Sequence, residues 1–171
     1  YYWLLLDKNK TSSNIAKEEK LVVFFGNDFF NTAEIDYARF IKRTNNCLEY
    51  IRRNCQECKL IYRPHPEERE EIKSLDLTSF IIQKDSQTAE EFVLENREKI
   101  KYAFSFCSTS SIASLSLGVN SYVFYRCFSD IFGGVNEIYV DNYLRDLPES
   151  FFIKSFNASL LQNKIEVKKD A

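Results

Sequence analysis

The sequence predicts an α/β domain with an open, Rossmann-like parallel sheet and helices on both faces. Residues 21–25 (LVVFF) form a continuous apolar run that ends at Gly26, a pattern typical of a strand buried on both faces. Similar runs alternate along the chain with segments of helical periodicity. Such alternation favours a parallel sheet, because each helix returns the chain to the edge where the next strand begins.

The expected elements follow a β-α-β-α-β-α-β-α-β order. Hydrophobic periodicity indicates the first helix, which the polar stretch around Asn45 could interrupt. Pro66 suits the first turn of the second helix, and Gly118 ends the fourth. The tail after Phe128 is less regular. Strands are expected at residues 21–25, 59–63, 80–82, 102–106 and 121–125, and helices at residues 33–55, 67–75, 89–99 and 110–117.

Composition and charge narrow the class of protein. Hydrophobic residues make up 44% of the 171 residues and aromatic residues 15%, which argues against disorder. The formal net charge is -2, so we expect no nucleic-acid partner held by bulk charge. No run of about 18 apolar residues is present. We therefore expect no segment of the chain to span a membrane.

We divide the chain into three parts. Residues 20–150 are expected to form the domain, residues 1–19 an interdomain linker or a truncation edge, and residues 151–171 a C-terminal tail or helix. The chain contains no Met, so we expect a piece of a longer protein. Residues 1–6 (YYWLLL) have no place in the predicted sheet. We expect them to pack on a surface meant for another domain, or against a second copy.

Cysteine usage gives no sign of a metal site. Cys55 and Cys58 have the spacing of a redox or zinc motif, but a zinc site needs two more ligands, and His65 is the only histidine. We interpret this pair as coincidental, and Cys107 and Cys127 as small buried apolar residues. A reducing compartment is the simplest interpretation.

The loop after the second predicted strand is the first candidate for chemistry, because ligands of open parallel sheets bind beyond the carboxyl ends of the strands. Residues 63–68 read RPHPEE, and the two prolines restrict Arg63 and His65 to extended conformations. We expect His65 to donate a hydrogen bond or a proton to a phosphate oxygen, with capping or packing as the alternative. Arg63 is a second candidate phosphate ligand, and a salt bridge to Glu67 or Glu68 is the alternative.

The loop after the fourth predicted strand is the second candidate. Ser108, Thr109, Ser110 and Ser111 lie where that strand turns into a helix. One hydroxyl is explained as an N-cap. The others, with the free N–H groups of the first helical turn and the helix dipole, predict an anion site. We expect His65 and these hydroxyls to converge on one phosphate, with the second and fourth strands on either side of the first.

Other strand exits contribute weaker candidates for the nucleotide or acceptor side. They are Gly26 and Asn27 after the first strand, Asp85 and Ser86 after the third, and Arg126 after the fifth. A plain turn and a helix cap are the alternatives for the first two pairs. The chain has no Gly-rich dinucleotide loop, no Walker lysine loop and no Asp-x-Asp pair, so we expect neither a cofactor nor a metal.

Two of these motifs carry a resemblance to a known group of enzymes. Residues 60–68 (LIYRPHPEE), followed by residues 105–113 (SFCSTSSIA), resemble bacterial surface-carbohydrate biosynthesis proteins, and most of all the sialyltransferase and polysialyltransferase families. Those families carry a His-Pro motif and a later Ser-rich motif. By this resemblance, His65 corresponds to the histidine that contacts the donor phosphate and stabilises the leaving nucleotide.

The Ser-rich motif of these families binds the same phosphate, and Ser110 and Ser111, with Ser108 and Thr109 beside them, match it. The resemblance covers about residues 59–126 and implies the donor-binding, C-terminal half of a GT-B fold. It also implies a metal-independent glycosyltransferase that makes bacterial surface polysaccharide or lipooligosaccharide, of which a CMP-sialic-acid-dependent sialyltransferase is one form.

The resemblance has consequences for partners and activity. A nucleotide-sugar would bind here, whereas the glycan acceptor and the acidic general base would belong to an N-terminal domain outside this chain. The fragment alone would then transfer nothing. The full-length protein would be cytoplasmic and could associate peripherally with the inner face of the membrane. Two alternatives stay open: a domain of a sugar-nucleotide 2-epimerase, and a non-catalytic scaffold in a capsule assembly complex.

Overall fold

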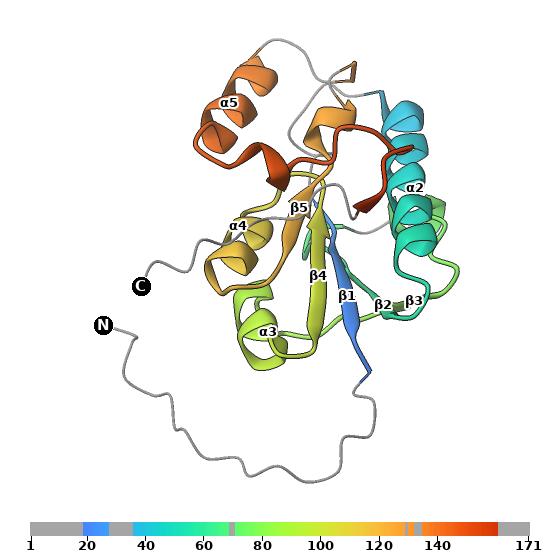
Figure 1. The fold of residues 1–171 in the computed structure, drawn as a ribbon. Helices are drawn as coiled ribbons and strands as arrows, with labels where there is room; N and C mark the ends of the chain where they lie inside the picture. The colour runs from blue at the N-terminus through green and yellow to red at the C-terminus, as the bar shows by residue number, and fades with distance from the viewer. Residues whose placement is uncertain (1–18, 28–35, 69–70, 129, 132–134, 161–171) are drawn as a thin grey trace, which may run out of the picture.

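The computed structural model describes residues 19–27, 36–68, 71–128, 130–131 and 135–160. The described residues form a five-stranded parallel sheet in the order β3-β2-β1-β4-β5, which confirms the predicted α/β, Rossmann-like fold (Figure 1). The chain therefore builds outward from β1 in one direction, then returns and builds outward in the other. The strands are β1 (Leu21–Phe25), β2 (Lys59–Arg63), β3 (Phe80–Ile82), β4 (Ile100–Ser105) and β5 (Ser121–Val123).

Alternation along the strands sorts the apolar side chains into two cores. In β1, Val22 and Phe24 face the core that contains α2 (Tyr37–Asn54), whereas Val23 and Phe25 face the core that contains α3 (Ala89–Asn96). Successive side chains of a strand point to opposite faces, so one continuous apolar run supplies both cores. The helices α2 and α3 therefore lie on opposite faces of the sheet, as Figure 1 shows.

Helix α2 runs without interruption through the polar stretch that could have broken it. Asp36 caps its N-terminus by accepting a hydrogen bond from the Arg39 N–H at 3.1 Å. Thr44 is buried, and its hydroxyl donates to the Phe40 carbonyl oxygen at 3.0 Å. The polar group is thus satisfied within the helix, and no break is needed.

The later elements agree with the expected order but differ in length. A capping box formed by Thr88 and Glu91 begins α3. Helix α4 (Thr109–Ser116) ends at Gly118, whose φ of 81° favours glycine. In place of the expected helix at residues 67–75, the described residues contain only a 3-10 turn, η1 (Glu71–Ser74). After β5 come η2 (Tyr125–Phe128), α5 (Val135–Leu144) and η3 (Glu149–Phe151).

Residues 151–160, which we expected to begin the C-terminal tail, belong to the folded core. Phe151, Phe152 and Ile153 are buried, and the Ile153 N–H donates to the Val123 carbonyl oxygen at 2.9 Å. A bridge between Phe152 and Val123 extends the sheet past β5. Leu160 is also buried, so the core continues to the end of this described range.

Residues 1–6, which we expect to pack on a surface meant for another domain or against a second copy, lie outside the described residues. Within the described part of the chain, no helix is long and apolar enough to cross a membrane.

Cys107 and Cys127 are buried and form no disulfide, as expected of small apolar residues. Burial raises the pKa of the Cys55 thiol to about 12 and that of the Cys127 thiol to about 11, the latter against the opposing charge of Arg43, so both thiols are protonated at neutral pH.

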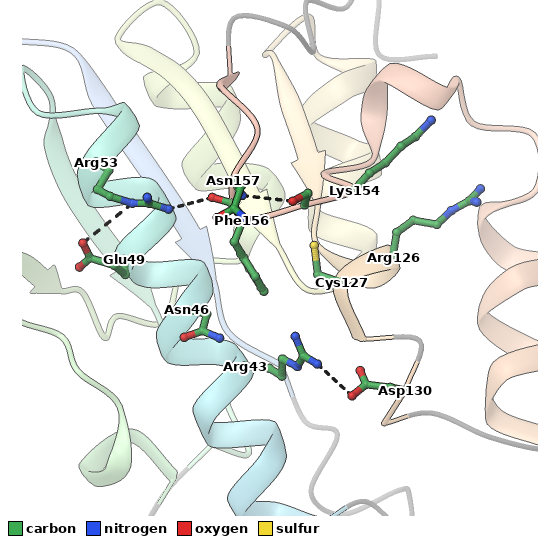
Figure 2. A pocket seen from close by; sticks show the side chains of 11 residues that line it. Arg43, Asn46, Glu49, Arg53, Arg126, Cys127, Asp130, Lys154, Phe156 and Asn157 are labelled. Atoms are coloured by element: carbon green, nitrogen blue, oxygen red, sulfur yellow. Dashed lines mark hydrogen bonds and ion pairs between the residues drawn. The ribbon is translucent and has the colours of Figure 1, made fainter.

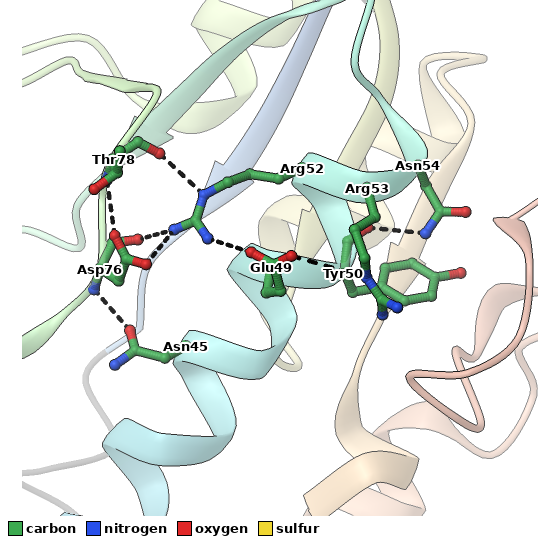
Figure 3. A network of polar contacts seen from close by, with 8 residues as sticks. All are labelled: Asn45, Glu49, Tyr50, Arg52, Arg53, Asn54, Asp76 and Thr78. Carbon is green, nitrogen blue, oxygen red and sulfur yellow. Dashed lines mark hydrogen bonds and ion pairs between the residues drawn. The ribbon is translucent and has the colours of Figure 1, made fainter.

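A polar network ties α2 to the segment that leads into β3 (Figure 3). Arg52 donates to the Thr78 carbonyl oxygen at 3.0 Å, to the Glu49 carboxylate at 2.6 Å and to Asp76. Asn45 accepts a hydrogen bond from the Asp76 N–H at 2.7 Å. The Arg52 side chain is only 17% exposed, so most of its charge is compensated within the protein.

Replacing Arg52 should weaken the docking of α2. We expect Arg52→Ala to lower the free energy of unfolding by about 2 kcal/mol, because several partly buried acceptors lose their donor at once. Lys42→Ala, at an exposed position of the same helix, is the control and should change it by less than about 0.5 kcal/mol. Urea denaturation measures both values, and equal effects of the two changes would contradict this role of Arg52.

Candidate functional site

The strand order brings two of the candidate loops to the same place. Phe25 at the end of β1 pairs with Arg63 of β2 on one side and with Ser105 of β4 on the other. Adjacent strands lie roughly 5 Å apart, so the ends of β2 and β4 are roughly 10 Å from each other. The prediction that these strands flank the first is confirmed. The loops that contain His65 and residues 108–111 thus leave the carboxyl edge at the switch point of the sheet, where open α/β folds bind ligands.

The loop with His65 is held by a buried carboxylate. Glu68 is 7% exposed and accepts hydrogen bonds from the Tyr62 hydroxyl and, at 3.0 Å, from the His65 backbone N–H. The Glu68 N–H donates back to the His65 carbonyl oxygen at 2.9 Å. Because both carboxylate oxygens of Glu68 are hydrogen-bonded, the loop over residues 65–68 is closed and the backbone of His65 has little conformational freedom.

The imidazole of His65 is oriented by its own loop. The Glu67 N–H donates to His65 Nδ1 at 3.3 Å, so Nδ1 acts as the acceptor. In a neutral imidazole the other nitrogen then carries the proton. Nε2 of the half-buried His65 is therefore the ring nitrogen that can donate to a ligand.

Gly26 lies against this loop so closely that no side chain fits. A Cβ on Gly26 would overlap the Glu68 carboxylate and come within 2.9 Å of the His65 nitrogen and 3.0 Å of the Tyr62 hydroxyl. The Gly26 N–H donates to the Arg63 carbonyl oxygen at 2.8 Å, which joins the β1 exit to the β2 exit. Glycine is thus required at position 26 by close packing, a reason that neither the predicted contact with the ligand or acceptor nor the alternative of a plain turn includes.

The Ser-rich loop has a buried half and an accessible half. Ser105 and Ser111 have no exposed surface, and the Ser111 hydroxyl donates to the Ser105 hydroxyl at 2.6 Å. Ser105 also accepts from the Ser108 N–H at 2.9 Å. The buried hydroxyl of Ser111, predicted as a phosphate ligand, therefore supports the loop from within instead.

The accessible half forms the start of α4. Ser108 is the N-cap, and its hydroxyl accepts from the Ser110 N–H at 3.2 Å and donates to the Ser110 hydroxyl at 3.1 Å. Thr109 is exposed and Ser110 is half-buried. The Ser110 and Ser111 N–H groups donate to the hydroxyl and carbonyl oxygens of Ser108. The positive end of the helix dipole and the Ser110 hydroxyl therefore remain to favour an anion at this point.

Arg63, the other predicted phosphate ligand, is occupied elsewhere. It is 7% exposed and makes two hydrogen bonds to the Asp85 carboxylate, at 2.9 and 3.1 Å. It also donates to the Gln87 carbonyl oxygen at 2.7 Å and lies over the Phe92 ring at 4.4 Å. The alternative of a salt bridge is thus correct, but its partner is Asp85 instead of Glu67 or Glu68. This pair joins the exit of β2 to the loop that begins α3.

The weaker candidates are spread over the carboxyl edge. Asn27 is buried beside Gly26. Asp85 is bound by Arg63 and by the Gln83 amide at 2.8 Å, and Ser86 is exposed in the same loop. Arg126 lies past β5, where it pairs with Glu149 at 3.1 Å. The structure therefore groups Gly26 and Asn27 with the His65 loop, and it separates Arg126 from that loop.

Two pockets of the described surface lie away from this switch point. One of about 740 Å³ and one of about 440 Å³ both include Arg126, and neither is lined by His65 or by residues 108–110. A phosphate needs only a few oriented donors, so the loops after β2 and β4 can hold one without an enclosed pocket. Among the described residues, no group of three or more His, Cys, Asp or Glu side chains is placed to hold a metal ion.

Sequence reasoning missed two residues of this site. Glu68 was considered only as a surface partner of Arg63, yet it is the buried carboxylate that fixes the His65 loop. Ser105 was read as part of a strand, yet its hydroxyl organises the Ser-rich loop. A polar residue at the last position of a buried strand was the available signal for Ser105. No comparable local signal marked Glu68, because it lies in a run of charges.

No known family model matches this chain, and no curated protein matches it either.

Close packing between Gly26 and Glu68 should appear as coupling between two substitutions. Gly26→Ala should lower the free energy of unfolding by about 2 kcal/mol, since the added methyl group displaces the carboxylate. In a Glu68→Ala background the same change should cost less by about 1 kcal/mol or more, because the main obstacle is gone. Urea denaturation of the wild type, the two single variants and the double variant measures the coupling energy. Strictly additive effects on the free energy of unfolding would show that the two residues do not interact.

The ion pair between Arg63 and Asp85 should make the stability of the fold depend on pH. The hydrogen bond from Arg63, followed by that from Gln83, lowers the pKa of the Asp85 carboxyl. A lowered folded-state pKa adds stability above the unfolded-state value, near pH 4, and this stability is lost as the pH falls through the folded-state value. Asp85→Asn should thus be less stable than the wild type at pH 7, and the difference should shrink between about pH 5 and pH 2. A difference that stays constant over this range in thermal denaturation would contradict the assignment.

Proposed function

We propose that this chain is the donor-binding domain of a metal-independent glycosyltransferase. The observation that carries the proposal is the position of two groups of hydrogen-bond donors on either side of β1. His65 offers Nε2 from the β2 exit. The start of α4 offers the Ser110 hydroxyl and the exposed Thr109 from the β4 exit, with the positive end of the helix dipole behind them. The donor would be a nucleotide-sugar whose phosphate lies between these loops.

Each group has a distinct task in the proposed reaction. The donors at the start of α4 bind the phosphate in the ground state, with the helix dipole behind them. His65 Nε2 donates a hydrogen bond to the phosphate oxygen that gains charge as the sugar leaves. Glu68 positions His65 through the backbone N–H at 3.0 Å.

The resemblance of the His-Pro and Ser-rich motifs supports a narrower form of the proposal. In that form the full-length enzyme makes bacterial surface polysaccharide or lipooligosaccharide, and CMP-sialic acid is one candidate donor. A second domain outside this chain would hold the glycan acceptor and the general base. The enzyme would work in the cytoplasm, at the inner face of the membrane where such acceptors are built.

Nucleotide titration of this chain, followed by NMR, tests the donor site. With CMP, UDP and GDP in separate titrations, we expect the largest shifts at His65 and at residues 108–110. His65→Ala should weaken binding of the preferred nucleotide by about ten- to hundredfold, as expected for a hydrogen bond to a charged group. Ser110→Ala should also weaken it. Unchanged spectra at His65 and at residues 108–110 with millimolar nucleotide would refute the proposal.

Ser116→Ala provides the matched control. Ser116 lies in the last turn of the same helix, and its hydroxyl donates to the Ile112 carbonyl oxygen at 3.0 Å. We expect this variant to bind nucleotide as the wild type does. If Ser116→Ala weakens binding as much as Ser110→Ala, the effect comes from the stability of α4 and not from contact with the phosphate.

A further inference from the structure

The turn between α2 and β2 brings two cysteines together. Cys55 is the C-cap of α2, and its N–H donates to the Ile51 carbonyl oxygen at 2.9 Å. The Cys58 N–H donates to the Cys55 carbonyl oxygen at 3.0 Å, which is the hydrogen bond of a β-turn. The Cα atoms at the two ends of such a turn lie within about 7 Å of each other, which overlaps the range of roughly 4.4 to 6.8 Å found in disulfides.

Both ends of this turn are fixed by the fold. On the α2 side, the Asn54 amide donates to the Tyr50 carbonyl oxygen at 2.9 Å and accepts from the Leu160 N–H at 3.1 Å (Figure 3). On the β2 side, the Lys59 N–H donates to the Lys20 carbonyl oxygen at 2.9 Å. The separation of the two cysteines is therefore set by the folded chain, so joining their thiols costs little conformational entropy.

The two thiols lie on the same face of the sheet. Cys55 belongs to the core on the α2 face, and Cys58 packs against that core. Cys55 is only 3% exposed, whereas Cys58 is half-buried, and both thiols are free. One thiol of the pair is thus open to a reagent in solution, and the other is covered by protein. The spacing alone favours coincidence, and it is the turn that places the two thiols together.

We propose that Cys55 and Cys58 form a reversible disulfide across this turn, with glutathione disulfide as the oxidant. The Cys58 thiolate attacks one sulfur of glutathione disulfide, so a mixed disulfide forms and one glutathione thiolate leaves. Cys55 then loses its proton and attacks the Cys58 sulfur, which closes the disulfide and releases the second glutathione thiolate. The two released thiolates take up the two protons that the cysteines lose. Two thiols of the chain are oxidised, and one glutathione disulfide is reduced to two glutathione molecules.

The surroundings of the pair favour a stable disulfide over a reactive thiolate. Burial, followed by the nearby Cys58, raises the pKa of the Cys55 thiol to about 12, and burial, against the opposing charge of Lys101, raises the pKa of the Cys58 thiol. The negative end of the α2 dipole also lies at Cys55. Thiol exchange is therefore slow, and the reduced pair gains no stability from ionisation. A disulfide formed by such a pair resists reduction, unlike the disulfides of catalytic pairs with a low thiol pKa.

This turn lies far along the sheet from the proposed donor site. It leads into the amino end of β2, whereas His65 and the start of α4 follow the carboxyl ends of β2 and β4. The two sites share no residue. The disulfide thus stands independently of the proposed function, and either proposal can fail without the other.

The remaining cysteines serve as internal controls. Cys47 and Cys107 are buried. Cys127 lines the larger of the two pockets, shown in Figure 2, but it is buried as well and its thiol donates to the Ile153 carbonyl oxygen at 3.2 Å. We expect these three thiols to stay reduced while Cys55 and Cys58 are oxidised.

Trypsin makes the test direct, because it releases residues 54–59 (NCQECK), which contain both cysteines of the turn and no other. The folded 171-residue chain is equilibrated with reduced and oxidised glutathione at the poise of the cytosol, and the free thiols are then alkylated with iodoacetamide in urea. We expect at least about half of this peptide to carry no alkyl group and to be lighter than the reduced peptide by two hydrogen atoms. The peptides with the other three cysteines should be alkylated.

Single substitutions separate the two steps of the reaction. Cys55→Ser should stop it after the first step and leave glutathione attached to Cys58. Cys58→Ser should leave Cys55 unmodified, because the thiol that remains is buried. Cys127→Ser is the matched control, since it removes a thiol outside the turn, and it should oxidise as the wild type does.

The oxidised chain should unfold at a temperature about 3 to 8 °C above that of the reduced chain, because the disulfide restricts the unfolded state. The proposal is overturned if the peptide of residues 54–59 stays fully alkylated, or if wild-type Cys58 retains glutathione at equilibrium. Loss of the disulfide in Cys127→Ser would also overturn it. A lower unfolding temperature after oxidation would do the same, since the bond would then distort the folded turn.

Discussion

Strand β1 pairs with β2 on one side and with β4 on the other, and its residues 22–25 are almost fully buried. A strand in this position must be apolar on both faces and must satisfy its backbone groups on both edges. The two cores exist because alternate residues of the same strand point into each of them. The chain also reverses its direction of growth at β1, so the loops after β2 and β4 leave the sheet on either side of the β1 exit. The candidate donor site is a consequence of that reversal.

Buried polar groups then shape the loops at this edge. The Glu68 carboxylate closes the His65 loop, Ser105 and Ser111 support the start of α4, and Arg63 joins β2 to the loop after β3. Each of these groups would carry a large penalty if it lost its partner, because it lies away from water. The loops are therefore held in one conformation before a ligand arrives. Binding then costs little conformational entropy, which favours recognition of a small charged group.

The arginines of the protein divide between two uses. Arg52 and Arg63 are largely buried, and each is matched by several acceptors, so they join elements of the fold. The cations around the large pocket are half-exposed and share their carboxylates. Exposed pairs of this kind contribute little to stability. The same residue type thus joins elements of the fold where it is buried and contributes mainly surface charge where it is exposed.

The sequence by itself determined the strands of the sheet and the residue types of the loops, but not the segments at residues 67–75 and 151–160. The strands at residues 21–25, 59–63 and 80–82 have the predicted bounds, because an apolar run or a helical period reflects neighbours a few residues away. The residue types after β2 and β4 were also sufficient to select His65 and residues 108–110 as candidates. Only the tertiary structure decided which side chains bind one another. Arg63 binds Asp85 and not Glu67 or Glu68, and Arg53 meets Phe156 from the far end of the chain. Such choices depend on which charged groups are brought together and removed from water, and that is settled by strand order and burial, which leave no local pattern in the sequence.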